Sequence, residues 1–185
     1  MKIFLRFKHW QLFSLLVCTY FGFKIVGNTT TVIASHGETI TYTEYSPLYF
    51  LFIAVLFGWF YTIGVNLTKK LPDTAKMNMT KFKLFMLILI FHIFFFYMFV
   101  HFRMQPNTAT IVVIVILNLF SMFCIPYCIY FNAKALKTIE LQRLVTFRDY
   151  VGEFFFLLFF PIGIWIIQPR INKIFDATLQ VKEQI

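Results

Sequence analysis

Residues 48–67 read LYFLFIAVLFGWFYTIGVNL, twenty positions without a charged side chain. A helix of that length rises about 30 Å at 1.5 Å per residue, which matches the hydrocarbon thickness of a bilayer. Twelve of the twenty residues are Leu, Ile, Phe or Val. At about −0.3 to −0.6 kcal/mol each, these side chains favour insertion by roughly 4–7 kcal/mol. The stretch predicts a transmembrane helix.

Three further apolar runs of comparable length occur at residues 9–26, 84–102 and 111–131. Hydrophobic residues make up 59% of the chain and charged residues 14%, whereas soluble domains carry about 45–50% and about 25%. A soluble fold of this size buries only about 70% of its surface, too little to hide so much apolar area. We therefore expect an all-α membrane protein with four spans, forming one polytopic domain over residues 1–185.

The basic residues are unevenly placed between the runs. Twelve fall before the first run, between the second and third, or after the fourth: Lys2, Arg6, Lys8, Lys69, Lys70, Lys76, Lys81, Lys83, Lys134, Lys137, Arg143 and Arg148. Cytoplasmic loops carry such an excess, so we expect the N-terminus and the loop at residues 68–83 to be cytoplasmic. The net charge of +9 is thus explained by topology, with the lipid bilayer as partner and no nucleic acid.

A fifth apolar segment, residues 151–169, is interrupted by Pro161 and Gly163. Its uncharged part, residues 154–169, would form only about 24 Å of helix, which is short of the bilayer. If it crossed, Arg170 would lie outside, against the charge rule. We therefore expect a re-entrant segment that dips and returns, with a short fifth span as the alternative.

The interval between the first two runs differs in composition. Residues 29–45 contain two β-branched stretches separated by Ser-His-Gly-Glu at positions 35–38. A glycine between two such stretches is typical of a hairpin turn. We expect a small extracytoplasmic β-hairpin that either ties the spans together or offers a contact surface.

Polar residues inside the spans are the candidates for function, because lipid cannot satisfy them. The fourth run carries a polar stripe at helical spacing, formed by Asn118, Ser121, Cys128 and Asn132. This face either makes contacts between helices or lines a pore. In the third run, His92 is either hydrogen-bonded to Asn118 or Ser121, or part of a proton or substrate path.

A metal site is a weaker possibility for the same region. His92, Cys124 and Cys128 are metal-ligating residue types, and the two cysteines are four residues apart on one helix. Two thiols and one histidine fall short of the spacing of a true zinc motif, so we predict no metal, no cofactor and no catalytic residue.

Small residues and one acid complete the candidates. Gly58 and Thr62 lie four apart on the second run, which favours close helix packing, either within the molecule or between copies. Glu153 opens the fifth segment, and we expect it to pair with Arg143, Arg148 or Arg170.

Two segments carry a resemblance to a known group of proteins. Residues 8–13 read KHWQLF and residues 160–173 read FPIGIWIIQPRINK. They resemble an uncharacterised family of small multi-span bacterial membrane proteins. The resemblance implies the bacterial cytoplasmic membrane as the compartment and brings no activity or site.

These features together predict an interaction protein. We expect a non-enzymatic scaffold or accessory subunit, associating with itself or with other membrane proteins. The alternative is a small channel or solute transporter subunit lined by the polar face of the fourth run, because that face could border water.

Overall fold

The computed structural model describes residues 3–26, 30–35, 38–43, 47–72, 75–101 and 107–183. Helices form the body of this part of the chain. The elements are α1 (Ile3–Arg6), α2 (His9–Val26), β1 (Thr30–Ser35), β2 (Glu38–Thr43), α3 (Pro47–Thr68), α4 (Met79–His101), α5 (Thr108–Leu141), α6 (Phe147–Leu158) and α7 (Phe160–Glu183).

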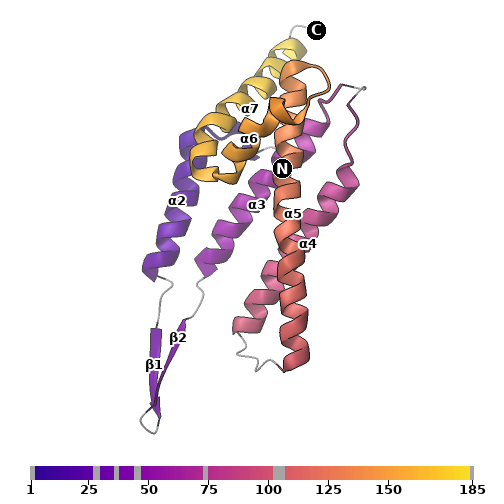
Figure 1. Ribbon diagram of the computed structural model, residues 1–185. Coiled ribbons are helices and arrows are strands. Elements are labelled where there is room, and N and C mark those ends of the chain that lie inside the picture. Colours follow the sequence, from indigo (N-terminus) through magenta and orange to yellow (C-terminus); the bar gives the residue numbers. More distant parts are fainter. Residues whose placement is uncertain are drawn as a thin grey trace.

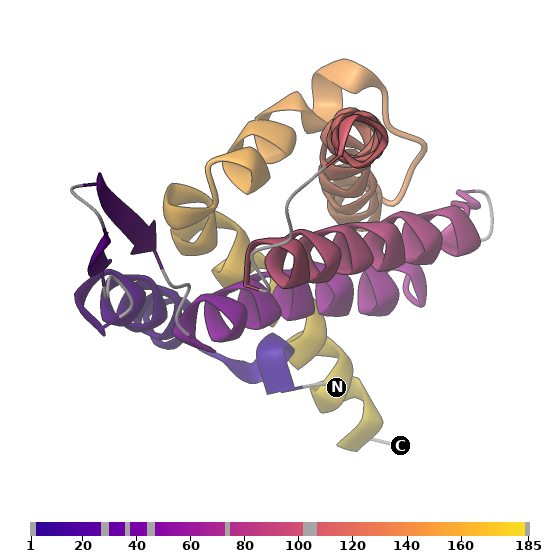
Figure 2. The same cartoon turned by 90° about the horizontal axis from the view of Figure 1, so that it is seen from below.

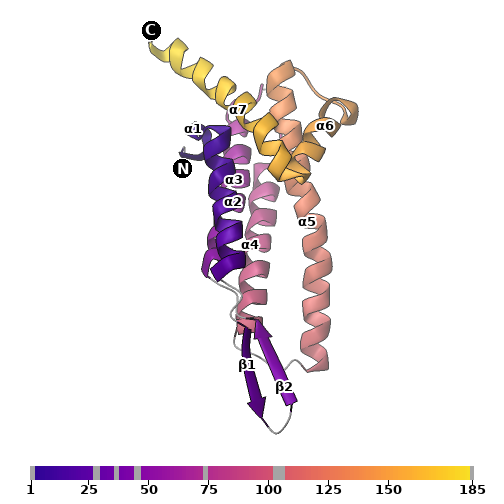
Figure 3. The same cartoon turned by 90° about the vertical axis from the view of Figure 1, so that its left-hand side faces the viewer.

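The long helices run alternately up and down. The two strands project from one end of the bundle, whereas α1, α6 and the far end of α7 lie at the other end (Figures 1 and 3). Viewed from below, α5 is nearly end-on, while α3 and α4 lie lengthwise and side by side (Figure 2). The α3–α4 connection and the α5–α6 turn therefore share the end that carries α1.

Among the residues that the structure describes, three helices are long and apolar enough to cross a membrane, over Phe50–Thr68, Met79–Tyr97 and Thr108–Leu141. Helix α2, at residues 9–26, is not among them, so the structure supports three of the four expected spans. Helix α2 contains 18 residues, and its sequence includes His9, Gln11 and Lys24. It packs along α3 and buries Leu12 and Leu16.

Between α2 and α3 the chain forms a two-stranded antiparallel sheet. The register places Thr30 opposite Thr43 and Ser35 opposite Glu38. The sheet occupies the interval for which a hairpin is predicted, although positions 29, 36–37 and 44–45 of that interval lie outside the described residues.

The fifth apolar segment turns back on itself. Helix α6 ends at Leu158 and α7 begins at Phe160, so Pro161 stands in the first turn of a new helix, where an absent N–H costs nothing. Glu153 near the start of the segment and Arg170 just beyond its end are joined by an ion pair of 2.7 Å. The segment's two ends therefore lie together, and α7 continues through Pro169.

Two buried clusters hold the helices together. The larger joins α2, α3, α5 and α7 and includes Leu16, Trp59, Leu136 and Ile167. The smaller lies between α4 and α5, where the Phe82 and Phe131 rings stack with centroids 4.4 Å apart.

A glycine permits the close approach of α3 to α4. A methyl group built at Gly64 would lie 2.5 Å from the Phe82 ring and 2.7 Å from Asn132 Oδ1. Both distances are shorter than van der Waals contact, so any side chain here would push the Phe82 ring out of its stack.

The outward faces of α4 and α5 are strongly apolar. In α5 the exposed large side chains include Ile111, Val112, Val113, Val115, Ile116, Leu119, Phe120, Met122 and Phe123. An apolar surface this continuous is far larger than soluble monomers expose. Contact with the hydrocarbon of a lipid bilayer accounts for this exposed apolar surface.

Candidate functional site

A buried glutamine ties three helices at the end of the bundle that carries α1. Gln168 of α7 is 1% exposed. Its Oε1 accepts a hydrogen bond of 2.8 Å from Trp59 Nε1 of α3. Its Nε2 donates to the backbone oxygens of Phe4 and Phe7, at 2.9 and 3.0 Å. The amide thus satisfies a buried indole, one carbonyl of α1 and one carbonyl of the α1–α2 connection.

Asn172, one helical turn further on, extends this polar junction. Its Nδ2 also donates to Phe7 O, at 3.1 Å, and its Oδ1 accepts from Gln168 Nε2 at 3.1 Å. At the start of α2, Gln11 Oε1 accepts from the backbone N–H of Lys8 at 2.9 Å, which is half of a capping box. These contacts fix where the chain enters α2.

Aromatic rings join the same two parts of the chain. The Trp165 ring lies 4.8 Å from the His9 ring and 5.4 Å from the Phe13 ring, centroid to centroid. The segments at residues 8–13 and 160–173 therefore pack against each other, although they lie at opposite ends of the sequence.

A charged cluster lies where α5, α6 and α7 meet. Arg170 Nη2 donates to Glu153 Oε1 at 2.7 Å, and Arg170 Nε donates to Glu140 Oε1 at 2.7 Å. Lys137 Nζ donates to Glu153 Oε1 at 3.0 Å. Two acids and two bases balance, so the cluster carries no net charge.

Glu153 is thereby held ionised. Burial alone would raise the pKa of this carboxyl, but hydrogen bonds from Arg170 and Lys137 outweigh it and hold the pKa below its usual range. The hydrogen bond to Glu140 and then the one to Glu153 raise the pKa of Arg170 despite its burial. Of the three arginines predicted to pair with Glu153, Arg170 is the partner. A carboxylate so fully paired is suited to joining helices rather than to moving protons.

Replacing Gln168 with leucine is expected to destabilise the chain by about 2 kcal/mol, because the buried Trp59 N–H would lose its acceptor. Thermal unfolding of the purified protein in detergent micelles measures the loss. The double variant Trp59→Phe/Gln168→Leu should cost less than the sum of the two single changes, since no indole donor remains to be orphaned. Strictly additive costs would contradict the role assigned to this hydrogen bond.

The predicted polar stripe of α5 is split between two environments. Ser121, Cys128 and Asn132 are buried, and Asn132 Nδ2 donates to Phe60 O of α3 at 3.1 Å. Asn118, by contrast, is exposed. The buried part joins helices, and only the outer end of the stripe reaches the surface.

His92 does not make the predicted hydrogen bond. Asn118 Nδ2 donates to Ile114 O of its own helix, and Ser121 Oγ donates to Leu117 O, both at 2.9 Å. His92 Nδ1 is buried and has no hydrogen-bond partner within the part of the chain that the structure describes. Backbone carbonyls one turn away compete successfully for these short polar side chains.

The metal candidates are not brought together. Across the described ranges, no group of three or more His, Cys, Asp or Glu residues is placed to hold a metal ion. Cys124 and Cys128 are buried in the cluster that includes Met86 and Leu89, so both thiols are surrounded by apolar side chains.

The small residues of α3 face the interior. A methyl group built at Gly58 would lie 3.2 Å from the Phe4 ring, so α1 packs directly on this glycine. Thr62 is buried, and its carbonyl oxygen accepts from Asn66 Nδ2 at 2.8 Å. Packing within the molecule accounts for this face.

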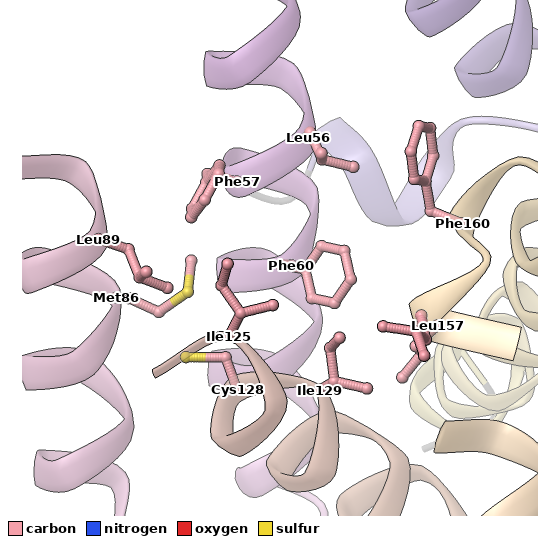
Figure 4. Close-up of a pocket in the computed structure, with 11 residues that line it drawn as sticks. Leu56, Phe57, Phe60, Met86, Leu89, Ile125, Cys128, Ile129, Leu157 and Phe160 are labelled. Atoms are coloured by element: carbon pink, nitrogen blue, oxygen red, sulfur yellow. The ribbon is translucent and has the colours of Figure 1, made fainter. Parts of the chain in front are cut away.

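Two apolar hollows flank the α6–α7 turn, and Phe160 lines both. One, of about 210 Å³, lies among α3, α4 and α5, with Phe60, Met86 and Cys128 in its wall (Figure 4). The other, of about 460 Å³, lies between α2 and α7. Neither has a charged side chain in its wall, so both suit hydrocarbon rather than a hydrated solute.

The sequence did not identify Gln168 or Asn172 as site residues. The available signal was a glutamine at the end of an uncharged run, where lipid would leave its amide unsatisfied. Its partners are backbone carbonyls 164 and 161 residues away, and no local pattern reveals such pairing.

A scan against protein-family models, a search of curated proteins and a search of solved structures each found no match to this chain.

Proposed function

We propose that this chain is a non-enzymatic membrane component that acts through helix contacts, as a scaffold or as an accessory subunit of a larger assembly. The observation that carries the proposal is how the polar side chains at the α1 end of the bundle are used. Gln168, Asn172, Glu153 and Arg170 are all engaged in joining helices. These contacts hold the helices together at one end of the bundle. The apolar faces of α4 and α5 remain exposed and can contact other helices in the membrane.

The placement in the membrane belongs to the same proposal. The end with α1, the α3–α4 connection and the α5–α6 turn carries Lys69, Lys70, Lys76, Arg143 and Arg148. The excess of basic residues favours the cytoplasmic side of a bacterial inner membrane for this end, N-terminus included. The α6–α7 pair then enters the membrane from that side and returns.

The geometry favours contact over conduction. A pore lined by α5 needs its polar residues to border water across the whole bilayer. Ser121, Cys128 and Asn132 are instead buried, and the cavity beside Cys128 has an apolar wall.

Photo-cross-linking in the native membrane tests the proposal. Phe123 on α5 is 75% exposed, and a photoreactive phenylalanine analogue at this position should yield discrete adducts with protein. The same analogue in place of Phe131, which is 1% exposed, should react only within the chain. Exclusively lipid adducts from Phe123 would contradict the proposal.

A second measurement addresses the channel alternative directly. Vesicles containing the purified chain should pass ions and small solutes no faster than empty vesicles. Flux that depends on the protein, and that Asn118→Leu abolishes, would favour the channel and overturn the scaffold proposal.

A further inference from the structure

Asn118 places an amide in the middle of an apolar surface. It lies ten residues after Thr108, where α5 begins, which corresponds to about 15 Å along the helix. The hydrocarbon is about 30 Å thick, so this side chain sits near the bilayer centre. There, polar side chains normally face other helices or water rather than lipid.

The amide keeps unused hydrogen-bonding capacity. An asparagine side chain has two N–H donors and one carbonyl acceptor. Within the described residues, its one hydrogen bond runs from Nδ2 to Ile114 O, at 2.9 Å. One N–H and the Oδ1 atom remain without a protein partner, and hydrocarbon supplies none.

The exposed residues around Asn118 follow a heptad spacing. Intervals of four, three, four and three residues separate the members of what we call the α5 seam: Ile111, Val115, Asn118, Met122 and Ile125. Every member is exposed, the apolar ones by 43% to 67%. Such spacing is the signature of a helix that packs lengthwise against another helix. A single asparagine in such a seam sets register and the number of chains.

We propose that two copies of this chain associate in the membrane through their α5 seams, with reciprocal hydrogen bonds between their Asn118 side chains. The amide is self-complementary, because each free N–H can donate to the Oδ1 of the other copy across a two-fold axis. This is why a second copy suits the seam, whereas an unrelated helix would need its own polar group at the same depth. The inference rests on the proposed function, of which it names one partner.

Energy transfer between donor- and acceptor-labelled full-length chains in phosphatidylcholine vesicles tests the inference over a lipid-dilution series. Wild type should associate reversibly. Asn118→Leu should weaken association roughly 3- to 30-fold, the range expected for interhelical hydrogen bonds in membranes. Asn118→Gln, which keeps both a donor and an acceptor, should retain most of the association.

Ser121→Ala is the matched control. Ser121 lies one turn away at nearly the same depth, but it is buried and bonded to Leu117 O, so its loss should leave association unchanged. Thermal unfolding of Asn118→Leu should match wild type, since the replaced side chain is exposed.

Three outcomes would overturn the inference. These are a wild type that stays monomeric at every dilution, an Asn118→Leu variant that associates like wild type, and a Ser121→Ala variant that weakens association equally. If Phe123 cross-links to a different membrane protein while the chain stays monomeric, the seam inference fails and the proposed scaffold function stands. If Phe123 yields only lipid adducts and the wild type also stays monomeric, both the seam inference and the proposed function are contradicted.

Discussion

Gly163→Ala is expected to destabilise the protein by about 3 kcal/mol, among the largest effects of any single methyl group in this chain. A methyl built at Gly163 overlaps the carbonyl oxygen of Phe156 and approaches the backbone N of Leu157 to 3.4 Å. Both obstacles are main chain, which cannot rotate away as a side chain can. The α6–α7 turn would have to open, and thermal unfolding in detergent micelles measures the loss.

Gly152→Ala provides the comparison for that change. Gly152 lies inside α6, and a methyl group there meets nothing within 4 Å. Alanine should therefore leave stability unchanged or raise it by up to about 1 kcal/mol, through its better helix propensity. Similar unfolding temperatures for the two variants would contradict the close approach of Gly163 to the Phe156 carbonyl in the α6–α7 turn.

Arg170→Met is expected to cost about 2–4 kcal/mol, because it leaves Glu153, which is 5% exposed, with Lys137 as its remaining cation. Removing one member of a buried ion pair strands the charge of the other. The Arg170 side chain is 28% exposed, which places the expected loss somewhat below that of a fully enclosed pair. Thermal unfolding measures this loss as well.

Two further variants separate charge burial from the loss of a long side chain. Arg143→Met removes an ion pair with Asp149 in which Arg143 is 58% exposed, and it should cost far less stability than Arg170→Met, because solvent screens an exposed pair. Glu153→Met/Arg170→Met should recover part of the Arg170→Met loss, since the stranded carboxylate of Glu153 is also removed and Lys137 and Glu140 remain 3.9 Å apart. If the double variant is less stable than Arg170→Met, charge burial is not the cause.

The sequence predicts the membrane-spanning body well because its signal is strong and local. Apolar runs at residues 48–67, 84–102 and 111–131 correspond to α3, α4 and α5. The first run, at residues 9–26, forms α2, which packs along α3 but is not among the three candidate spans of the described residues. The interruption at Pro161 correctly marks a break, but only the Glu153–Arg170 pair reveals that the segment reverses.

The sequence predicts those contacts of the candidate site that join residues close together along the chain, and it does not predict the contacts between distant helices. Arg170 was one of three possible partners for Glu153, and the direction of α7 decided among them. His92 was expected to bond to α5, but Asn118 and Ser121 bond to their own backbone. The contact between Gly64 and Phe82 depends on how α3 approaches α4, which helical periodicity alone does not encode.

The bonds from Gln168 to Phe4 and Phe7 have a consequence for biosynthesis. The residues they join are separated by 164 and 161 positions, so Phe4 and Phe7 leave the ribosome long before Gln168 does. Helices α3 to α5 can enter the bilayer in order, but the carbonyl groups of Phe4 and Phe7 cannot make these bonds until Gln168 has been translated. The junction around Phe4 and Phe7 therefore closes only after residue 168 has been made, and a chain stalled before that residue would keep this junction accessible to proteases.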